Sequence, residues 1–430
     1  MPELKRSLGL VECTLMGVGV MLGAGIYALV GQAAMLAGNT VWISFLAASI
    51  VASFTGLSYA ELSSFIPKAG GEYYYASRAF GHRVAFLVTW LLSIGIAICS
   101  ATVALGFGGY LSAMAGADEV WAASLLVVAV AGLLVYGLKQ SAWVAGICTA
   151  LEVIGLGIII AVGLPRLGTI DYFETATDGQ TGTLAAAALI FFAYIGFEEI
   201  VQLAEETRNA PRTIPRALLL SIVITTALYV IVALSAISVL GWRQLGASKS
   251  PLADVAALAL GHQAFLGLSV IALFSTGNTV LILLMSGARL LYGMAEDGSL
   301  PRIFAKLHQS RNSPYVATCS VAALAIVMIV SLRNILAIAN LTNFTLLTTF
   351  TLVNAAVIVL RYREPNAVRP FRVPGRLGRL PVIPVLGVLS SLTMLLFVGW
   401  KAALIGTALV VAGLVFYELS GWLRGRHSDK

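Results

Sequence analysis

The sequence predicts an all-α protein that crosses a membrane many times, with two interrupted helices inside an inverted repeat. Hydrophobic residues make up 59% of the 430 residues, charged residues make up 11%, and the mean hydropathy is +0.92. Soluble domains carry about a quarter charged residues, so a water-soluble enzyme is excluded. A transmembrane helix needs about 20 apolar residues, and the chain divides into twelve such stretches. They are too long, and alternate too little, for barrel strands.

Turn-forming residues and prolines separate the twelve predicted spans. Pro165 is expected to end the fifth span, and Pro211 and Pro215 are expected to break the chain after the sixth. A basic loop at 361–381 precedes the last two spans. The spans are expected at residues 11–37, 40–66, 83–113, 119–138, 141–164, 183–205, 215–241, 264–294, 315–332, 335–360, 382–400 and 402–423.

The basic residues predict the orientation of these spans. With the N-terminus inside, 22 of the 27 Lys and Arg residues face the cytoplasm, in accord with the positive-inside rule. We therefore expect a multi-pass protein of the cell membrane (plasma or inner), with residues 1–10 and 424–430 in the cytoplasm. The net charge of +7 does not indicate nucleic acid, because the basic residues line span ends and form no separate domain. The expected surroundings are a lipid bilayer.

Small residues interrupt the first and sixth spans near their midpoints. The first reads GVGVMLGAGIYALVG from Gly17 to Gly31, and the sixth reads FFAYIGFEEI from Phe191 to Ile200. Residues 11–164 and 183–360 overlay as two five-span repeats, and an odd number of spans inverts the second copy. Inverted repeats with broken helices are typical of secondary transporters. The two spans at 382–423 lie outside the repeat, so they are available for contacts between subunits. The sequence predicts no particular oligomeric state.

The interruptions predict a site for an amino acid. Amide groups at the start of a half-helix attract anions, while carbonyls freed by unwinding attract cations. The alternative is close helix packing through small residues such as Gly19 and Gly23, four apart. The carboxylate is expected at Gly23, Ala24, Gly25 and Ile26. The ammonium is expected at Phe192, Ala193, Tyr194, Ile195 and Gly196.

At these residues the sequence resembles the amino acid–polyamine–organocation (APC) superfamily of transporters. Besides the first-span glycines, the similarity includes YAELSSFIPKAGGEYYYASRAFG (59–81), FAYIGFE (192–198) and EETRNAPRTIPRA (205–217). The resemblance implies a five-plus-five inverted-repeat fold, alternating access, and amino acid or amine substrates. The sequence departs from the superfamily at two places. Its Asn209-Ala210-Pro211-Arg212 moves a loop proline by one residue, and Glu152 stands where sodium-independent relatives carry a lysine, three residues after Thr149.

Glu152 is the leading candidate for coupling. It lies 13 residues from both Lys139 and Pro165, and it is the only charged residue between them, so we expect it near the bilayer midplane. An ionisable residue there is a functional candidate by default. The hypothesis is that Glu152 carries a coupling proton or balances a cationic substrate. The alternative is a neutral glutamic acid that is hydrogen-bonded to a neighbouring span.

Other polar and aromatic residues are weaker candidates. Ser275, Thr276 and Thr279 line the cavity or bind sodium, or else form ordinary interhelical hydrogen bonds. Phe191 gates the substrate or packs in the core. Glu198 and Glu199 follow the break of the sixth span, and one of them is expected to cap its second half, where negative charge is favoured, or else to pack there. Glu12 and Glu61 are expected in salt bridges near the cytoplasmic ends of their spans.

The remaining functional classes lack support in the sequence. Its four histidines have no metal-ligand spacing, its four cysteines lie in apolar stretches, and no nucleotide-binding motif is present. We therefore expect no metal, no cofactor and no enzymatic activity. The prediction is a secondary amino acid transporter that is proton-coupled or exchanging and sodium-independent, although sodium is kept open as a partner. The alternative is a carrier or antiporter of amines or polyamines.

Overall fold

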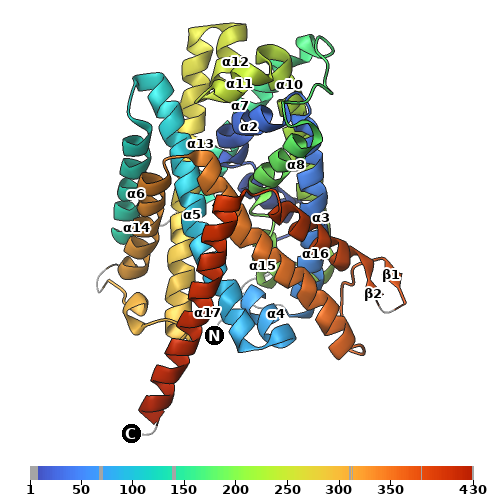
Figure 1. Ribbon diagram of the computed structural model, residues 1–430, viewed down its shortest axis with the longest axis vertical. Helices are drawn as coiled ribbons and strands as arrows, with labels where there is room; N and C mark the ends of the chain where they lie inside the picture. Colours follow the sequence, from blue (N-terminus) through green and yellow to red (C-terminus); the bar gives the residue numbers. More distant parts are fainter. Residues whose placement is uncertain are drawn as a thin grey trace.

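The apolar stretches of the sequence form helices, because a segment in lipid must satisfy its own backbone hydrogen bonds. The computed structural model describes residues 8–66, 71–137, 142–308, 311, 313–378 and 380–428. These residues form helices and a single two-stranded hairpin (Figure 1).

The helices of the first half follow the predicted spans closely. Within the described residues they are α1 (Leu10–Met21), α2 (Ala24–Ala37), α3 (Val41–Phe65), α4 (Gly71–Phe80), α5 (His82–Ala115), α6 (Glu119–Val135), α7 (Ala142–Gly163) and the 3-10 turn η1 (Leu164–Arg166).

The second half begins with a span in several pieces and continues with long helices. The pieces are α8 (Gly179–Ile190), η2 (Phe191–Tyr194), α9 (Glu199–Gln202) and η3 (Leu203–Glu206). They are followed by α10 (Ala210–Leu240), α11 (Trp242–Ala247), α12 (Pro251–Leu260), α13 (His262–Glu296), η4 (Arg302–Ala305), α14 (Tyr315–Leu332), α15 (Ile335–Arg363), β1 (Arg376–Leu377), β2 (Leu380–Pro381), α16 (Val382–Leu395) and α17 (Trp400–Ser428).

The described helices make this a polytopic membrane protein. Among the described residues, nine spans are long and apolar enough to cross a bilayer, or ten if the bent pair α1 and α2 is counted as one span. Helices α6 and α16 have only 17 and 14 residues, but they occupy the spans predicted at 119–138 and 382–400. The all-helical membrane class is therefore confirmed, while the twelve-span layout and the repeat boundaries stay predictions.

The prediction that Pro211 and Pro215 break the chain is wrong. Helix α10 begins at Ala210 and contains both prolines. Pro211 lies in the first turn, where a missing N–H removes no intrahelical bond. Pro215 lies one turn further along, where the surrounding structure tolerates the loss of a single bond. The sixth and seventh spans are consequently joined by a tight connection around Asn209, whose φ is 50°.

The two ends of the molecule are built differently. Helices α11 and α12 cover one end, and both chain termini lie at the other (Figure 1). At the covered end, α11 packs against α2, and Asn39 donates from Nδ2 to the carbonyl of Asp171 at 2.7 Å. At the other end Leu8 forms a bridge with Thr207, which ties α1 to the end of the sixth span. The broken spans lie between these two closures.

Candidate functional site

The breaks in the first and sixth spans lie directly against each other. Leu22 and Gly23 separate α1 from α2, whose axes differ by 51°. In the sixth span the chain turns at Gly196, where a φ of 111° favours glycine. A Cβ atom added to Gly25 would lie only 2.6 Å from Cα of Ala193. The two backbones therefore touch at the point where both helices are interrupted.

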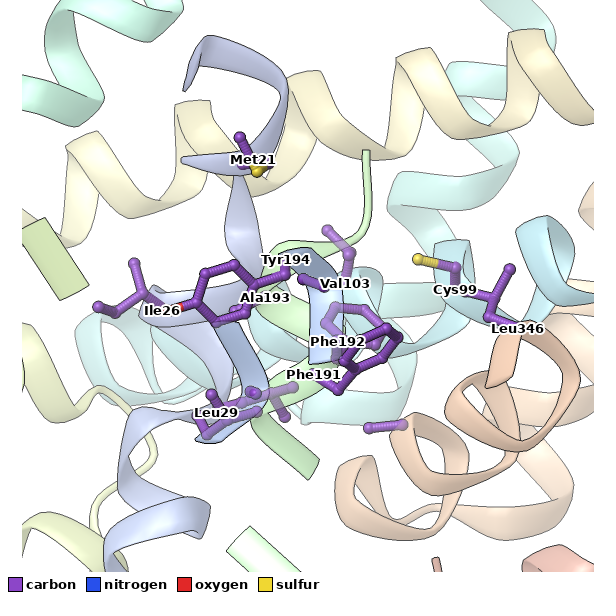
Figure 2. Close-up of a cluster of buried hydrophobic side chains, with 14 of the residues drawn as sticks. Met21, Ile26, Leu29, Cys99, Val103, Phe191, Phe192, Ala193, Tyr194 and Leu346 are labelled. Carbon is purple, nitrogen blue, oxygen red and sulfur yellow. The ribbon is translucent and has the colours of Figure 1, made fainter. Parts of the chain in front are cut away.

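The side chains around this junction are apolar. Figure 2 shows Ile26 of the first span beside the ring of Tyr194 of the sixth, and Met21 and Phe192 belong to the same buried cluster. Other members of the cluster come from α5 and α15 and include Cys99, Val103 and Leu346. Such walls suit an apolar ligand side chain, while the polar groups of the site are supplied by backbone.

The start of α2 presents amide groups that the helix itself does not use. The first N–H groups of a helix have no intrahelical partner, and no side chain caps this helix at its N-cap residue, Gly23. Gly23, Gly25 and Ile26 are all buried. The Ala24 side chain lies outside the described residues. A buried, uncapped N-terminus of a 14-residue helix carries a partial positive charge, so its geometry is suited to a carboxylate.

Two side chains that sequence reasoning missed bind carbonyls at the breaks. The Tyr229 hydroxyl of α10 lies 2.5 Å from the Met21 carbonyl oxygen and 3.1 Å from that of Ala193. Asn343 of α15 donates from Nδ2 to the carbonyls at the end of α8, at 2.7 Å and 3.1 Å. The sequence held no distinguishing signal, because Tyr229 follows Thr225 and Thr226 closely and Asn343 lies in a span rich in Asn and Thr. The Ala193 carbonyl, expected to accept an ammonium, is thus occupied by Tyr229 here.

Glu152 lies beside the break of the first span. Its side chain is 2% exposed, and its Oε2 has no hydrogen-bond partner among the described residues. The Tyr27 hydroxyl of α2 donates to its backbone carbonyl at 2.8 Å. Ser275 of α13 is the neighbouring hydroxyl, and it too lacks a hydrogen-bond partner among the described residues. Ser275 is thus the hydroxyl that a hydrogen bond from Glu152 to a neighbouring span would use, and that alternative stays a prediction.

The three hydroxyl candidates of α13 do not all face the same way. Thr279 faces the first break, because its Oγ1 would lie 2.9 Å from a Cβ added at Gly23. Both threonines donate to carbonyls of their own helix, Thr279 to Ser275 at 3.0 Å and Thr276 to Ala272 at 2.7 Å. The methyl group of Thr276 faces α5 at Gly106. Ser275 and Thr279 thus flank the junction with Glu152, and Thr276 is directed elsewhere.

The aromatic and acidic residues of the sixth span stabilise its break. Phe191 packs edge-on against Phe350 of α15, with ring centroids 5.9 Å apart. The Tyr194 hydroxyl donates to the Phe45 carbonyl at 3.0 Å. The carboxylate of Glu198 accepts the N–H of Gly196 at 2.9 Å, a residue before the start of α9, and its side chain makes no capping bond to that helix, so the capping role stays a prediction. The gating role of Phe191 stays a prediction.

A further acid lies outside the spans, beneath the sixth-span break. Glu72 of α4 is buried, and burial raises the pKa of its carboxyl group. Between α4 and the break lies Tyr59, whose ring contacts Tyr75 and Phe197 at centroid distances of 6.4 Å and 6.0 Å. The motif that contains Tyr59 and Glu72 therefore packs directly under the candidate site.

Discontinuous helices that meet inside a polytopic membrane protein define a class, the membrane transport proteins. The chain belongs to the amino acid permease family, whose family model matches residues 8–416. This confirms the superfamily resemblance, and it agrees with the prediction of a transporter and not an enzyme.

Several characterised relatives resemble the chain over most of its length. It is 32% identical to the branched-chain amino acid permease BcaP of Bacillus subtilis, covering 97% of this chain and 93% of that protein. It is 30% identical to the methylthioribose transporter of the same organism, covering 86% and 85%. It is 31% identical to the vacuolar cationic amino acid transporter 2 of Arabidopsis thaliana, covering 76% of this chain and 56% of that protein.

Proposed function

We propose that this protein is a secondary active amino acid transporter that works by alternating access. It resides in the cell membrane with both termini in the cytoplasm, in accord with the distribution of its basic residues. One observation carries the proposal: the buried, uncapped N-terminus of α2 lies against the unwound segment of the sixth span.

Each part of an amino acid has a counterpart in this arrangement. The carboxylate binds the free amides of Gly23 to Ile26. The ammonium binds carbonyls of the segment from Phe192 to Gly196, once the ligand competes with Tyr229 for the Ala193 oxygen. The side chain packs against the apolar walls. We therefore propose neutral, branched apolar amino acids as preferred substrates, in line with the name of the B. subtilis permease.

Glu152 is the proposed coupling group. A carboxylate that is 2% exposed and has an unsatisfied Oε2 is unfavourable as an ion unless a cation or a proton accompanies it. As the cavity opens to one side and then the other, Glu152 gains and loses a proton. Transport is then sodium-independent and driven by the pH gradient, with Ser275 and Thr279 as neighbouring hydroxyls.

The test is uptake into proteoliposomes that contain the purified protein. Labelled leucine, isoleucine, valine, lysine and arginine are supplied with and without an inward proton gradient, and with and without sodium. We expect concentrative uptake of the branched-chain amino acids that needs the proton gradient and ignores sodium. Glu152→Gln should abolish the dependence on pH gradient, while Glu418→Gln, at an exposed position on α17, should preserve it. Unchanged proton-driven uptake by Glu152→Gln would refute the coupling role.

An amine carrier is the second candidate, because the unsatisfied Glu152 carboxylate is suited to neutralise a cationic substrate. Decarboxylated analogues of the same amino acids separate the two functions. An amino acid carrier should not transport them, since the α2 amides lose their carboxylate partner. An amine carrier should transport them and fail on the parent amino acids.

A further inference from the structure

The connection between α15 and α16 is strongly basic. We call residues 364–381 the strap. Its residues 365–381 include four arginines and no acidic residue. The arginines are Arg369, Arg372, Arg376 and Arg379, and the last lies outside the described residues. Of the other three, Arg369 has a buried side chain, while Arg372 and Arg376 are exposed.

The first part of the strap is fixed to the ends of α3 and α15. Arg361 binds both carboxylate oxygens of Glu61, and Arg369 lies 3.4 Å from the same carboxylate. The side chains of these three residues are only 2–4% exposed. The backbone N–H of Val373 donates to Glu61 at 2.8 Å, and Arg361 donates to the Val373 carbonyl at 3.0 Å. Arg361 and Arg369 are thus already neutralised within the protein.

The second part of the strap projects away from the helices. Its β1–β2 hairpin extends sideways, beyond α15 and α16, in Figure 1. Because α16 begins at Val382, directly after β2, the hairpin lies at the level where this predicted span enters the bilayer. The space beside a membrane protein at that level is occupied by lipid headgroups.

The exposed side chains of the hairpin, and of Arg372 just before it, combine charge with apolar surface. Arg372 and Arg376 are exposed, and neither guanidinium has a hydrogen bond or ion pair with any described residue. Leu377 is 74% exposed and Leu380 is 39% exposed. Free arginines beside exposed leucines are typical of segments that lie in the membrane interface. A soluble acidic partner would give no reason for the leucines.

We propose that the hairpin and the adjoining Arg372 bind anionic phospholipid headgroups, with Arg372 and Arg376 on the phosphates and Leu377 inserted among the acyl chains. Guanidinium groups pair with phosphate through two parallel hydrogen bonds, and the negative surface of an anionic leaflet adds attraction for each arginine. The proposal rests on the membrane class of the protein and is independent of its substrate and coupling ion. Bound lipid also restricts the motion of the strap and, through Val373, of the Glu61–Arg361 ion pair.

The test uses the full-length protein in phosphatidylcholine bilayers with increasing phosphatidylglycerol. Electron paramagnetic resonance of spin-labelled lipids measures the preference of the protein surface for phosphatidylglycerol over phosphatidylcholine. Each arginine near an anionic surface contributes about fivefold to affinity. We therefore expect Arg372→Gln with Arg376→Gln to reduce the affinity of this site by more than tenfold. Raised salt should weaken binding by the wild-type protein.

Three further variants separate the proposal from a general charge effect. Arg302→Gln with Lys306→Gln removes the same charge from an exposed loop between α13 and α14, and it should leave the preference intact. Arg372→Lys with Arg376→Lys should retain most of it. Leu377→Ser should weaken binding while keeping the charge. A wild-type preference in the Arg372/Arg376 glutamine variant, or an equal loss in the Arg302/Lys306 variant, would overturn the proposal.

Discussion

Tyr229 is the side chain that connects the two halves of the candidate site. It is fully buried, and its hydroxyl lies within hydrogen-bond distance of carbonyls from both broken spans. A phenol has a single proton, so it donates to one carbonyl at a time or shares the proton between them. The same hydroxyl therefore holds the junction closed and competes with an incoming ammonium group.

Substituting Tyr229 with phenylalanine tests this double role. The change leaves two buried carbonyls without their donor, which should lower the free energy of unfolding by about 1–3 kcal/mol. We also expect a changed KM, because the Ala193 carbonyl becomes available to substrate. Thermal unfolding and uptake measure the two effects.

Tyr172→Phe is the matched control, because it removes a hydroxyl that is bonded to Ser238 at 2.7 Å at the covered end. It should lower stability without altering KM. If both tyrosine variants changed KM alike, the special position of Tyr229 would be contradicted.

At the scale of elements, the close approach of the two broken spans depends on a missing side chain. Gly25→Ala places a Cβ atom 2.6 Å from the backbone of Ala193. Overpacking of this kind typically lowers stability by about 1–3 kcal/mol, and here it also separates the two halves of the site. We expect uptake to fall to near background, while expression in the membrane persists.

The control for this substitution is Gly157→Ala on α7, where an added Cβ meets no atom within 4 Å. Alanine is the better helix former, by about 1 kcal/mol, so this variant should be as stable as the wild type or more so. Normal uptake by the Gly25→Ala protein would show that the close contact is dispensable.

The sequence predicted the elements whose signal is local. Long apolar runs give the spans, and α14 begins and ends where it was expected, at Tyr315 and Leu332. The breaks were found because glycine is unfavourable inside a helix. Helices α4, α11 and α12 were missed, since such short helices depend on tertiary packing more than on their own propensity. Pro215 was expected to break the chain but lies inside α10. Tertiary packing again outweighs a local preference, here the tendency of proline to end a helix.

The polar contacts of the site are less predictable. Tyr229 reaches a carbonyl that lies 208 residues away in the sequence, and Asn343 reaches one 155 residues away. Nothing local distinguishes these residues from polar residues that bond within their own helix, as Thr276 does. Their partners become visible only when the fold places α10 and α15 against the breaks.

At the scale of the whole molecule, the candidate site lies between two closures of different chemistry. At the covered end, Glu174 accepts a hydrogen bond from Trp242 at 3.1 Å and lies 3.5 Å from Arg243. These residues border an open pocket of about 440 Å³ that is also lined by Asn39 and Asp171. At the end with the termini, the buried cluster of Glu61 joins α3 to α15. Alternating access would require one closure to loosen while the other holds.

The two kinds of ion pair should differ strongly in their contribution to stability. Glu61→Gln leaves two buried arginines without a counter-charge, and breaking a buried pair in this way typically costs about 3–5 kcal/mol. Glu418→Gln breaks a pair with Arg83 whose side chains are about 60% exposed, and it should cost less than about 1 kcal/mol. Denaturation of the purified variants measures both. Similar losses for the two would mean that the Glu61 cluster is not a structural joint.

The surface pair of Arg78 and Glu364 gives the molecule a defined response to acid. Arg78 donates two hydrogen bonds to Glu364, at 2.9 Å and 2.7 Å, and thereby lowers the pKa of that carboxyl group. A carboxyl with a lowered pKa stabilises the fold fully above its unfolded pKa of about 4.3. This contribution is lost as the pH falls through the folded pKa.

We therefore expect Glu364→Gln to unfold at a lower temperature than the wild-type protein at pH 7, with a difference that shrinks below about pH 4. The variant is informative because it leaves Arg78 stacked over Phe65, 4.4 Å from the ring centroid. High salt should reduce the difference at pH 7, since the pair is partly exposed. A difference that stayed constant from pH 7 to pH 3 would show that Glu364 acts through packing and not through its charge.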